Sequence, residues 1–292
     1  MADARRVRVG VREAPVTYTA RVVSDALVST GWVAQHLTTT GVRVIDVASS
    51  ADGYASGHLP GALPIDWRRE LIPDEDESSG HVIDPERFGA LARRLGLRHD
   101  DTLVFYGDEG GRHAIRALWT FEYYRHGGAL HFMDGGRERW RAEGRPLTTE
   151  PTPLVPSDYP VPSARRPEVR IAKDEIRARL GSDGFTVLDV RTPEEYAGTD
   201  LRAARGGHIP GAVHRFWEDA LTGDGALLPR DELSRLYADV PRDSTVAVHC
   251  QLGVRAAHTW FVLRHVLDYP DVRNYDGSWQ EWGNDPETPV EA

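Results

Sequence analysis

The sequence predicts an α/β protein made of two copies of one domain, each with a mainly parallel central sheet flanked by helices. Two observations predict this class: segments of the first half recur in the second, and short β-branched runs alternate with helical patterns. The length of 292 residues suits two domains of ordinary size, and a hydrophobic content of 40% supplies enough apolar material for their cores.

The duplication rests on four segments that recur in the same order and at nearly constant spacing. The matching pairs are 42–47 with 185–190, 57–62 with 207–212, 101–106 with 244–249, and 133–136 with 275–278. A tryptophan follows the last segment in both halves. Four ordered matches indicate a tandem duplication whose copies differ mainly in the lengths of their loops.

In the second half, residues 186–190 and 245–249 are predicted strands. Helices are predicted at 173–180, 230–237 and 255–267. In the last of these, apolar residues recur every three or four positions, which gives the helix one buried face. Strands that alternate with helices favour a parallel sheet covered on both sides, with ligands bound beyond the carboxyl ends of its strands.

The composition and the prolines suggest how the chain is divided. Residues 1–23 are expected to form a flexible basic tail, 24–147 an inactive first domain, 148–168 a proline-rich and extended linker, and 169–292 the catalytic domain. The chain has no apolar run long enough to span a membrane, and its beginning has no secretory pattern, so we expect a cytoplasmic protein. The net charge of −10 disfavours a nucleic-acid partner.

Cys250 is the only cysteine, which excludes an internal disulfide, a cysteine zinc site and a redox pair. It follows a predicted strand and precedes a predicted helix. In that position the backbone N–H groups of the loop residues are expected to surround the sulfur and to favour a thiolate. Cys250 is therefore the predicted nucleophile, and the residues predicted to bind the substrate or a persulfide are Gln251, Leu252, Gly253, Val254 and Arg255.

Two of these loop residues have specific expected roles. Gly253 permits a sharp turn and the close approach of a ligand, because it has no Cβ. Arg255 adds a permanent positive charge with a planar fork of donors that suits an anionic substrate.

Together these motifs resemble the rhodanese family of sulfurtransferases. The resemblance is carried by Gly-His-Ile-Pro-Gly-Ala at 207–212, by Cys-x-x-Gly-x-Arg at 250–255 and by Tyr-Asp-Gly-Ser-Trp at 275–279. It covers nearly the whole chain and is similar to the tandem thiosulfate and 3-mercaptopyruvate sulfurtransferases. The resemblance implies a cysteine that accepts a sulfane sulfur, becomes a persulfide, and passes the sulfur to cyanide or a thiol. It also implies a site between the two domains.

The first half is predicted to be chemically silent. Gly107 stands where the second half has Cys250, and Asp108 and Glu109 place negative charge where an anion would bind. Three residues of this half are candidates for lining the cleft, although core packing is the commoner role for such residues: Trp32, Trp67 and Arg68.

Other functions share part of this pattern. Cysteine-dependent phosphatases and arsenate reductases have five residues between cysteine and arginine, whereas four separate Cys250 from Arg255. The shorter loop favours a single sulfur over a tetrahedral phosphate. A sulfur-carrier or protein-interaction module is a further alternative, so a protein acceptor remains open beside small-molecule donors and acceptors.

The choice of sulfur donor depends on few residues. The resemblance places Glu195 where vertebrate members have a substrate-binding arginine, which favours thiosulfate over 3-mercaptopyruvate. Arg191 is the candidate for supplying a replacement cation, followed by Arg202 and Arg205. The histidines form no cluster with the spacing of metal ligands, so no metal and no cofactor are expected.

Overall fold

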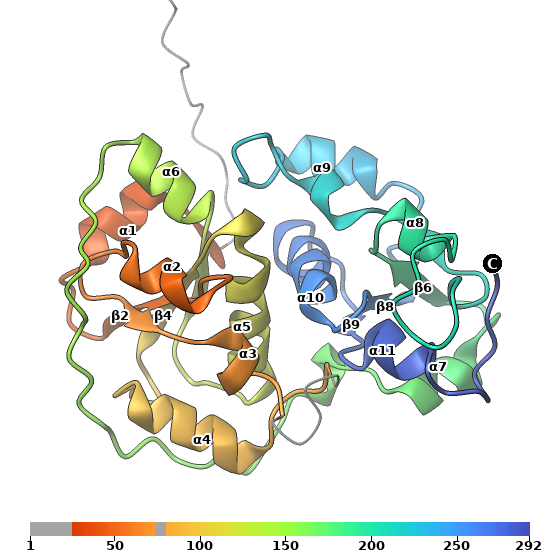
Figure 1. Cartoon of the computed structure of the whole chain (residues 1–292), viewed down its shortest axis with the longest axis horizontal. Coiled ribbons are helices and arrows are strands. Elements are labelled where there is room, and N and C mark those ends of the chain that lie inside the picture. Colours follow the sequence, from red (N-terminus) through yellow and green to blue (C-terminus); the bar gives the residue numbers. More distant parts are fainter. Residues whose placement is uncertain (1–24, 74–79) are drawn as a thin grey trace, which may run out of the picture.

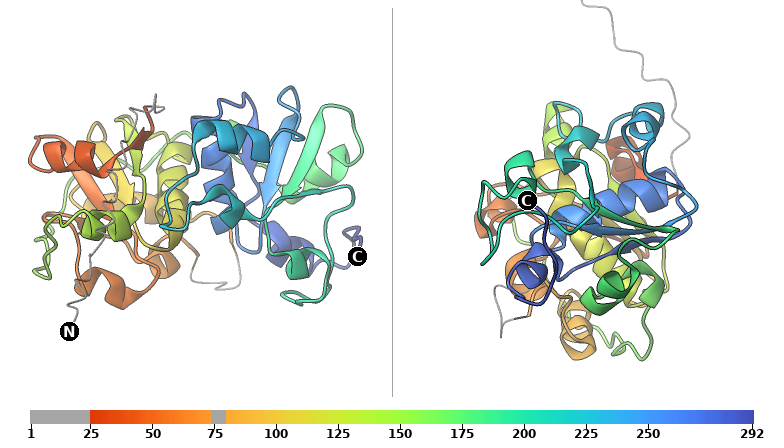
Figure 2. Two further views of the ribbon diagram at one scale, coloured as in Figure 1. Left: turned by 90° about the horizontal axis from the view of Figure 1, so that it is seen from above. Right: turned by 90° about the vertical axis from the view of Figure 1, so that its right-hand side faces the viewer.

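The computed structural model describes residues 25–73 and 80–292. They form two lobes, each around its own sheet (Figures 1 and 2). The tail predicted over residues 1–23 lies outside the described residues.

The first lobe contains the five strands β1 Leu27–Val28, β2 Val42–Asp46, β3 Leu63–Pro64, β4 Thr102–Tyr106 and β5 Leu130–Met133. Its helices are α1 Thr30–His36, α2 Ala51–Ala55, α3 Trp67–Glu70, α4 Pro85–Arg94, the 3-10 turn η2 Glu109–Gly111, α5 Arg112–Tyr123 and α6 Gly136–Ala142.

The second lobe contains the strands β6 Phe185–Asp189, β7 Val213–His214, β8 Thr245–His249 and β9 Val272–Asn274. Its helices are η3 Pro167–Val169, α7 Lys173–Arg179, α8 Pro193–Tyr196, η4 Trp217–Ala220, α9 Arg230–Leu236, α10 Val254–Phe261, the π-helical continuation η5 Val262–Val266, and α11 Ser278–Trp282.

The two sheets share one topology. The first has the order β1-β5-β4-β2-β3, the second has β7-β6-β8-β9, and the named strands pair in parallel. Beside β9, a parallel bridge between Arg170 and Asn274 occupies the place that β1 has beside β5. The predicted fold of two mainly parallel sheets flanked by helices is confirmed.

The strand that leads to Cys250 is buried at every position. β8 reads Thr-Val-Ala-Val-His, and its β-branched residues suit a strand covered on both faces. It pairs with β6 in a register that places His249 opposite Asp189. In the first lobe the same register places Tyr106 opposite Asp46. In each lobe, therefore, one central strand ends at a buried aspartate and the neighbouring strand ends at a buried ring-bearing residue.

The predicted helix after Cys250 has the expected apolar face. α10, its π-helical continuation and the residue that follows it are buried at the positions that the sequence pattern indicates, namely Ala256, Trp260, Leu263 and Leu267. α10 packs directly against α5, the equivalent helix of the first lobe. Figure 2 shows these two helices between the two sheets.

The interface between the lobes is apolar and continuous with both cores. One hydrophobic cluster includes Phe105 and Trp119 from the first lobe together with Val248 and Trp260 from the second. Because the same cluster crosses the interface, separating the lobes would expose core residues to water.

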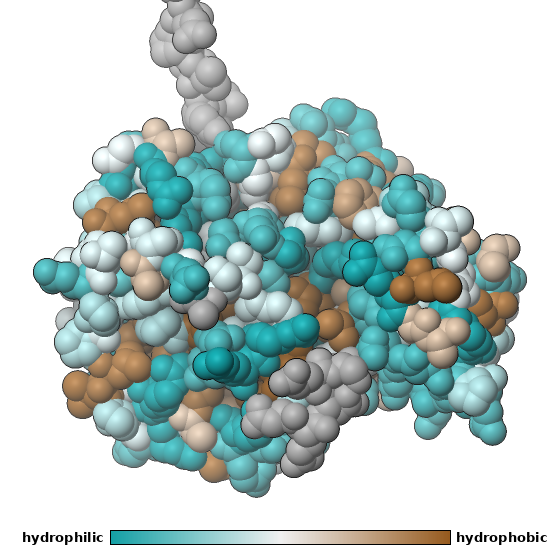
Figure 3. Space-filling view, in the orientation of Figure 1, coloured by the Kyte–Doolittle hydropathy of each residue, from teal (hydrophilic) through white to brown (hydrophobic). Residues whose placement is uncertain are grey.

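The proline-rich segment 148–168 runs along the outside of the first lobe (Figure 1) and contains no helix before η3 begins at Pro167. Thr148 forms an antiparallel bridge with His58, and the Ser157 N–H donates to the Arg93 carbonyl at 3.0 Å. Tyr159 is buried there. The face shown in Figure 3 is mainly hydrophilic. Among the described residues, no helix combines the length and the apolarity needed to cross a membrane.

Candidate active site

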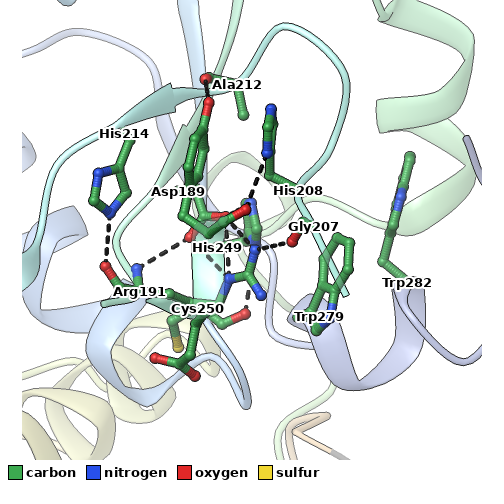
Figure 4. Close-up of polar contacts among 12 residues, drawn as sticks. Asp189, Arg191, Gly207, His208, Ala212, His214, His249, Cys250, Trp279 and Trp282 are labelled. Carbon is green, nitrogen blue, oxygen red and sulfur yellow. Dashed lines mark hydrogen bonds and ion pairs between the residues drawn. The ribbon is translucent and has the colours of Figure 1, made fainter. Parts of the chain in front are cut away.

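Cys250 directly follows β8 and lies in the interior, with 1% of its surface exposed. Figure 4 shows its sulfur beside the ends of the central strands of the second lobe. The loop that follows turns at Gly253, whose φ of +70° is the left-handed region. A Cβ at this position would lie 2.7 Å from the Asp276 Cα, so glycine is needed both for the turn and for the space.

The carbonyl groups of the loop are turned toward α11. The N–H groups of Trp279 and Gln280 donate to the carbonyls of Cys250 and Gln251 at 2.9 and 3.1 Å. In a trans peptide the next N–H points away from the carbonyl, so the N–H groups of Gln251 and Leu252 are turned to the opposite side.

Within the described part of the chain, the N–H groups of Gln251 and Leu252 in the loop and of Val254 and Arg255 at the start of α10 have no hydrogen-bond acceptor. A row of free N–H groups at the start of a helix favours an anion. The side chain of Gln251 does not take part in this row of N–H groups. Its Nε2 donates to the Arg202 carbonyl and to Oε1 of Gln280. Val254 is buried.

Ser278 fixes the loop. Its hydroxyl accepts hydrogen bonds from the N–H groups of Cys250 and Gly253 at 3.1 and 3.0 Å, and donates to the Tyr275 carbonyl at 2.7 Å. The Gly253 N–H is therefore not available to a ligand, unlike its neighbours. Sequence reasoning missed this role of Ser278. The duplication offered one sign of it, since the equivalent position of the first lobe is Gly136, which has no hydroxyl.

Arg255 is held by a buried carboxylate. Its guanidinium forms two hydrogen bonds with Glu195, at 2.6 and 2.9 Å. Glu195 is fixed in turn by a capping box with Thr192 at the start of α8. Burial alone would lower the pKa of Arg255, but the bond to Glu195 and the neighbouring charges of Cys250 and Glu195 raise it. Arg255 is thus a permanent cation beside the thiol, compensated by Glu195.

Arg191 has a different environment from the one the sequence suggests. It is fully buried and paired with Asp189 through Nε and a terminal nitrogen, and it also donates to the Gly207 carbonyl (Figure 4). Its guanidinium carbon lies 4.3 Å from the ring centre of Trp279. These contacts hold the Arg191 guanidinium inside the second lobe, and its role in binding the substrate stays a prediction.

The other arginines considered for the site are also engaged elsewhere. Arg205 donates to carbonyl groups near the end of the chain, including that of Thr288 at 2.7 Å. Arg202 is exposed and pairs with Asp200.

The histidines near the loop are neutral at pH 7. Burial lowers the pKa of His249 to about 4, although the charge of Asp189 opposes this, and burial lowers that of His258 to about 3. The His249 ring lies 3.4 Å from the Asp189 carboxylate, farther than a normal hydrogen bond. Neither histidine supplies a cation to Cys250.

The equivalent loop of the first lobe has glycine at the position of Cys250, and little space for a side chain there. A Cβ at Gly107 would lie 2.5 Å from the Val47 carbonyl oxygen, closer than side chains are found. Asp108 accepts a hydrogen bond from the Ser49 N–H, and Glu109 pairs with Arg112. The position equivalent to Cys250 is therefore a glycine, and backbone atoms of Val47 fill the space that a side chain would need.

The first-lobe candidates for lining the cleft have these neighbours. Trp32 stacks on His36 within its own lobe. Trp67 stacks on His113 with ring centres 4.3 Å apart, and Arg68 lies over the Trp67 ring.

A different part of the first lobe covers the Cys250 loop. Gly80 lies so close that a Cβ there would be 2.6 Å from the Leu252 carbonyl oxygen. The Val82 N–H donates to the Asp276 carboxylate at 2.8 Å, and that carboxylate also binds Arg170. Sequence reasoning gave no indication of this contact, because it joins residues far apart in the chain.

Comparison with known proteins agrees with this architecture. The model of the rhodanese-like domain matches twice, at residues 29–143 and 172–285. A thiosulfate sulfurtransferase of Corynebacterium glutamicum is 42% identical over 92% of this chain and 91% of its own. The sulfur carrier protein TtuD of Thermus thermophilus is 40% identical over 89% and 94%.

A solved structure is also similar over almost the whole chain. The anaerobic ergothioneine biosynthesis enzyme of Chlorobium limicola superposes with a TM-score of 0.84 at 25% identity, covering 96% of this chain and 73% of its own. The two matches of the domain model cover most of the residues of both lobes. The chain belongs to the rhodanese family of sulfurtransferases, as a tandem of two rhodanese-like domains.

Proposed function

We propose that this protein is a thiosulfate sulfurtransferase that moves a sulfane sulfur to cyanide or a thiol through a persulfide on Cys250. The observation that carries the proposal is a lone cysteine at a strand end, followed by a loop whose free N–H groups and Arg255 favour a bound anion. The name of the Corynebacterium relative supports thiosulfate as the donor.

In the first step, the Cys250 thiolate attacks the outer sulfur of thiosulfate. A new sulfur–sulfur bond forms while the one in thiosulfate breaks, and the bonding electron pair leaves with sulfite. Cys250 then carries a persulfide anion, which the N–H groups of Gln251, Leu252 and Val254 stabilise electrostatically.

In the second step, cyanide or a thiolate attacks the terminal sulfur of the persulfide. The carbon–sulfur or sulfur–sulfur bond of the product forms, the persulfide bond breaks, and its electron pair returns to Cys250. One cysteine is sufficient, because the acceptor carries the sulfur away. In support, EanB, a structural relative with 25% identity and a TM-score of 0.83, has been solved with a cysteine persulfide.

A protein acceptor is the second candidate. TtuD, which is 40% identical, is a sulfur carrier protein, so the persulfide of this chain is also proposed to reach a protein thiol or carrier. The two routes share the first step and differ only in the nucleophile of the second. We further propose a cytoplasmic location, since a reducing compartment keeps a lone thiol active; activity confined to a secreted fraction would contradict it.

The donor is tested by steady-state rates with thiosulfate and with 3-mercaptopyruvate, using cyanide as the common acceptor. We expect a higher kcat/KM for thiosulfate, because Glu195 compensates Arg255 and stands where the rhodanese resemblance places a substrate-binding arginine. A higher kcat/KM for 3-mercaptopyruvate would contradict the proposed donor. A Cys250→Ser variant serves as the control, and we expect it to be inactive with both donors.

A further inference from the structure

Asp276 is a fully buried carboxylate at the interface between the lobes, between β9 and α11. The Val82 N–H of the first lobe donates to its Oδ2 at 2.8 Å. Nε of Arg170 donates to both of its oxygens, at 2.9 and 3.0 Å. One carboxylate thus joins a segment of the first lobe to the beginning of the second.

The backbone around Asp276 supports the Cys250 loop. A Cβ at Gly253 would lie 2.7 Å from the Asp276 Cα and 2.8 Å from the Asp276 carbonyl oxygen, so the turn of the loop rests against this backbone. Two residues after Asp276, the Ser278 hydroxyl accepts hydrogen bonds from the N–H groups of Cys250 and Gly253. The Trp279 N–H donates to the Cys250 carbonyl at 2.9 Å. The position of these residues therefore determines where the free N–H groups of the loop lie.

The first lobe has an equivalent aspartate with an equivalent contact. Asp134 aligns with Asp276 in the duplication, and its carboxylate accepts the Leu227 N–H of the second lobe at 2.8 Å. The loop of the first lobe is attached in the same way, since the Arg137 N–H donates to the Gly107 carbonyl at 2.9 Å. Each lobe therefore extends a segment to the aspartate of the other, but one of the two loops has no nucleophile.

The position of the loop matters for the reaction because its N–H groups stabilise negative charge. A misplacement of about 1 Å at such a site can cost on the order of a hundredfold in rate. Residues that support a reacting group are effective when buried polar contacts lock their own positions. Asp276 meets this condition, since it is fully buried and its two oxygens accept three hydrogen bonds.

We propose that Asp276 is a positioning residue for sulfur transfer, whose bonds to Val82 and Arg170 hold the backbone that shapes the Cys250 loop. The proposal rests on the proposed function, since it concerns the same reaction at the same cysteine. Asp276 acts through the loop and is not itself a reacting group. The first lobe, which lacks a nucleophile, takes part in the reaction through this contact.

The test compares Asp276→Asn with Asp134→Asn in the full chain, with kcat and KM measured for thiosulfate and cyanide. Both variants keep the shape of the side chain and remove its charge. Each weakens one hydrogen bond across the interface and one ion pair, with Arg170 or with Arg139. The two aspartates adjoin different loops. A general effect on the interface therefore changes both variants, whereas a positioning effect on Cys250 changes one.

We expect Asp276→Asn to lower kcat about tenfold and to change KM by less than about twofold, because the pair of Arg255 and Glu195 is left in place. We expect Asp134→Asn to keep the parent kcat. Arg170→Lys keeps a cation beside Asp276 and should stay near the parent kcat, whereas Arg170→Met should lower kcat as Asp276→Asn does.

A folded Asp276→Asn protein with the parent kcat would overturn the proposal. An equal fall of kcat in Asp134→Asn would also do so, because it would assign the effect to the interface as a whole. Chemical denaturation establishes that each variant is folded. If neither Asp276→Asn nor Arg170→Met folds, the ion pair serves stability alone and the proposal is wrong.

The parent protein tests the proposed function separately. A parent that transfers no sulfur from thiosulfate refutes that donor, and the variants are then compared by the rate at which iodoacetamide alkylates Cys250, the only cysteine, at neutral pH. We expect this rate to fall about threefold or more in Asp276→Asn, because displaced N–H groups favour the thiolate less, and to stay unchanged in Asp134→Asn. An unchanged rate in Asp276→Asn would contradict the positioning role, whatever the donor.

Discussion

The guanidinium of Arg255 and the carboxylate of Glu195 form a two-point ion pair beside the Cys250 loop, with bonds of 2.6 and 2.9 Å. Glu195 is 3% exposed and comes from α8, which carries the capping box with Thr192. The pair fixes the orientation of Arg255. The negative charge of Glu195 also weakens the electrostatic attraction between Arg255 and a bound anion.

Arg255→Ala should raise the KM for thiosulfate about tenfold or more with a smaller effect on kcat, because it removes a cation and leaves Glu195 unpaired. The double variant Arg255→Ala with Glu195→Gln should recover part of the loss, since it removes the uncompensated carboxylate. Arg202→Ala, at an exposed arginine, is the control. An unchanged KM in Arg255→Ala would remove Arg255 from the anion site.

Ser278→Ala should reduce kcat/KM about tenfold and lower the free energy of unfolding by about 1–3 kcal/mol. The variant leaves the N–H groups of Cys250 and Gly253 without their acceptor, so the loop loses its fixed shape. Kinetics and chemical denaturation measure the two effects. Ser157→Ala, which removes a hydroxyl bonded to the Leu97 carbonyl, should leave kcat/KM unchanged. Equal kinetics in both variants would contradict the role of Ser278.

Gly107→Cys should not create a second active site. Its Cβ would lie 2.5 Å from the Val47 carbonyl oxygen, so we expect a loss of about 1–3 kcal/mol in the free energy of unfolding. In a Cys250→Ser background, treatment with thiosulfate should leave the mass of the protein unchanged. A sulfur adduct at residue 107 would show that the first lobe retains the chemistry.

Stability should fall as the pH is lowered from about 6.5 toward 4. Burial lowers the pKa of His249 to about 4 and that of His258 to about 3, from an ordinary 6.5. In this window the unfolded chain binds protons that the folded chain excludes, so stability rises with pH, by about 1.4 kcal/mol per unit for each such histidine.

The His258→Leu variant separates this effect from other titrations. Denaturation between pH 4.5 and about 6 should give a slope shallower than the parent by up to about 1.4 kcal/mol per pH unit, as one buried neutral histidine is lost. His99→Gln, at an exposed position, is the control. An identical slope in the His258→Leu variant would mean that this ring is protonated in the folded protein.

The parts of the site that could be predicted are those carried by neighbouring residues. The strand before Cys250 and the glycine turn after it lie within a few positions of this cysteine. The duplication identified the first lobe as the one without a cysteine. The apolar face of α10 was visible for the same reason, since its period follows from helix geometry.

The rest depends on contacts between distant segments. Val82 is 194 residues from Asp276, and Glu195 is 60 from Arg255. No local pattern in the sequence indicates either contact. For Arg191, the buried contacts with Asp189 and Gly207 decide the environment, whereas the sequence offered it only as a candidate cation for the substrate.

The central claim is that Cys250 accepts a sulfur atom from thiosulfate, and intact-protein mass spectrometry tests it most directly. After treatment with thiosulfate and removal of the excess, the protein should gain the mass of one sulfur atom, peptide mapping should assign it to Cys250, and cyanide should remove it with release of thiocyanate. Cys250→Ser should gain nothing. A folded parent protein that shows no adduct, or one located away from Cys250, would contradict the account.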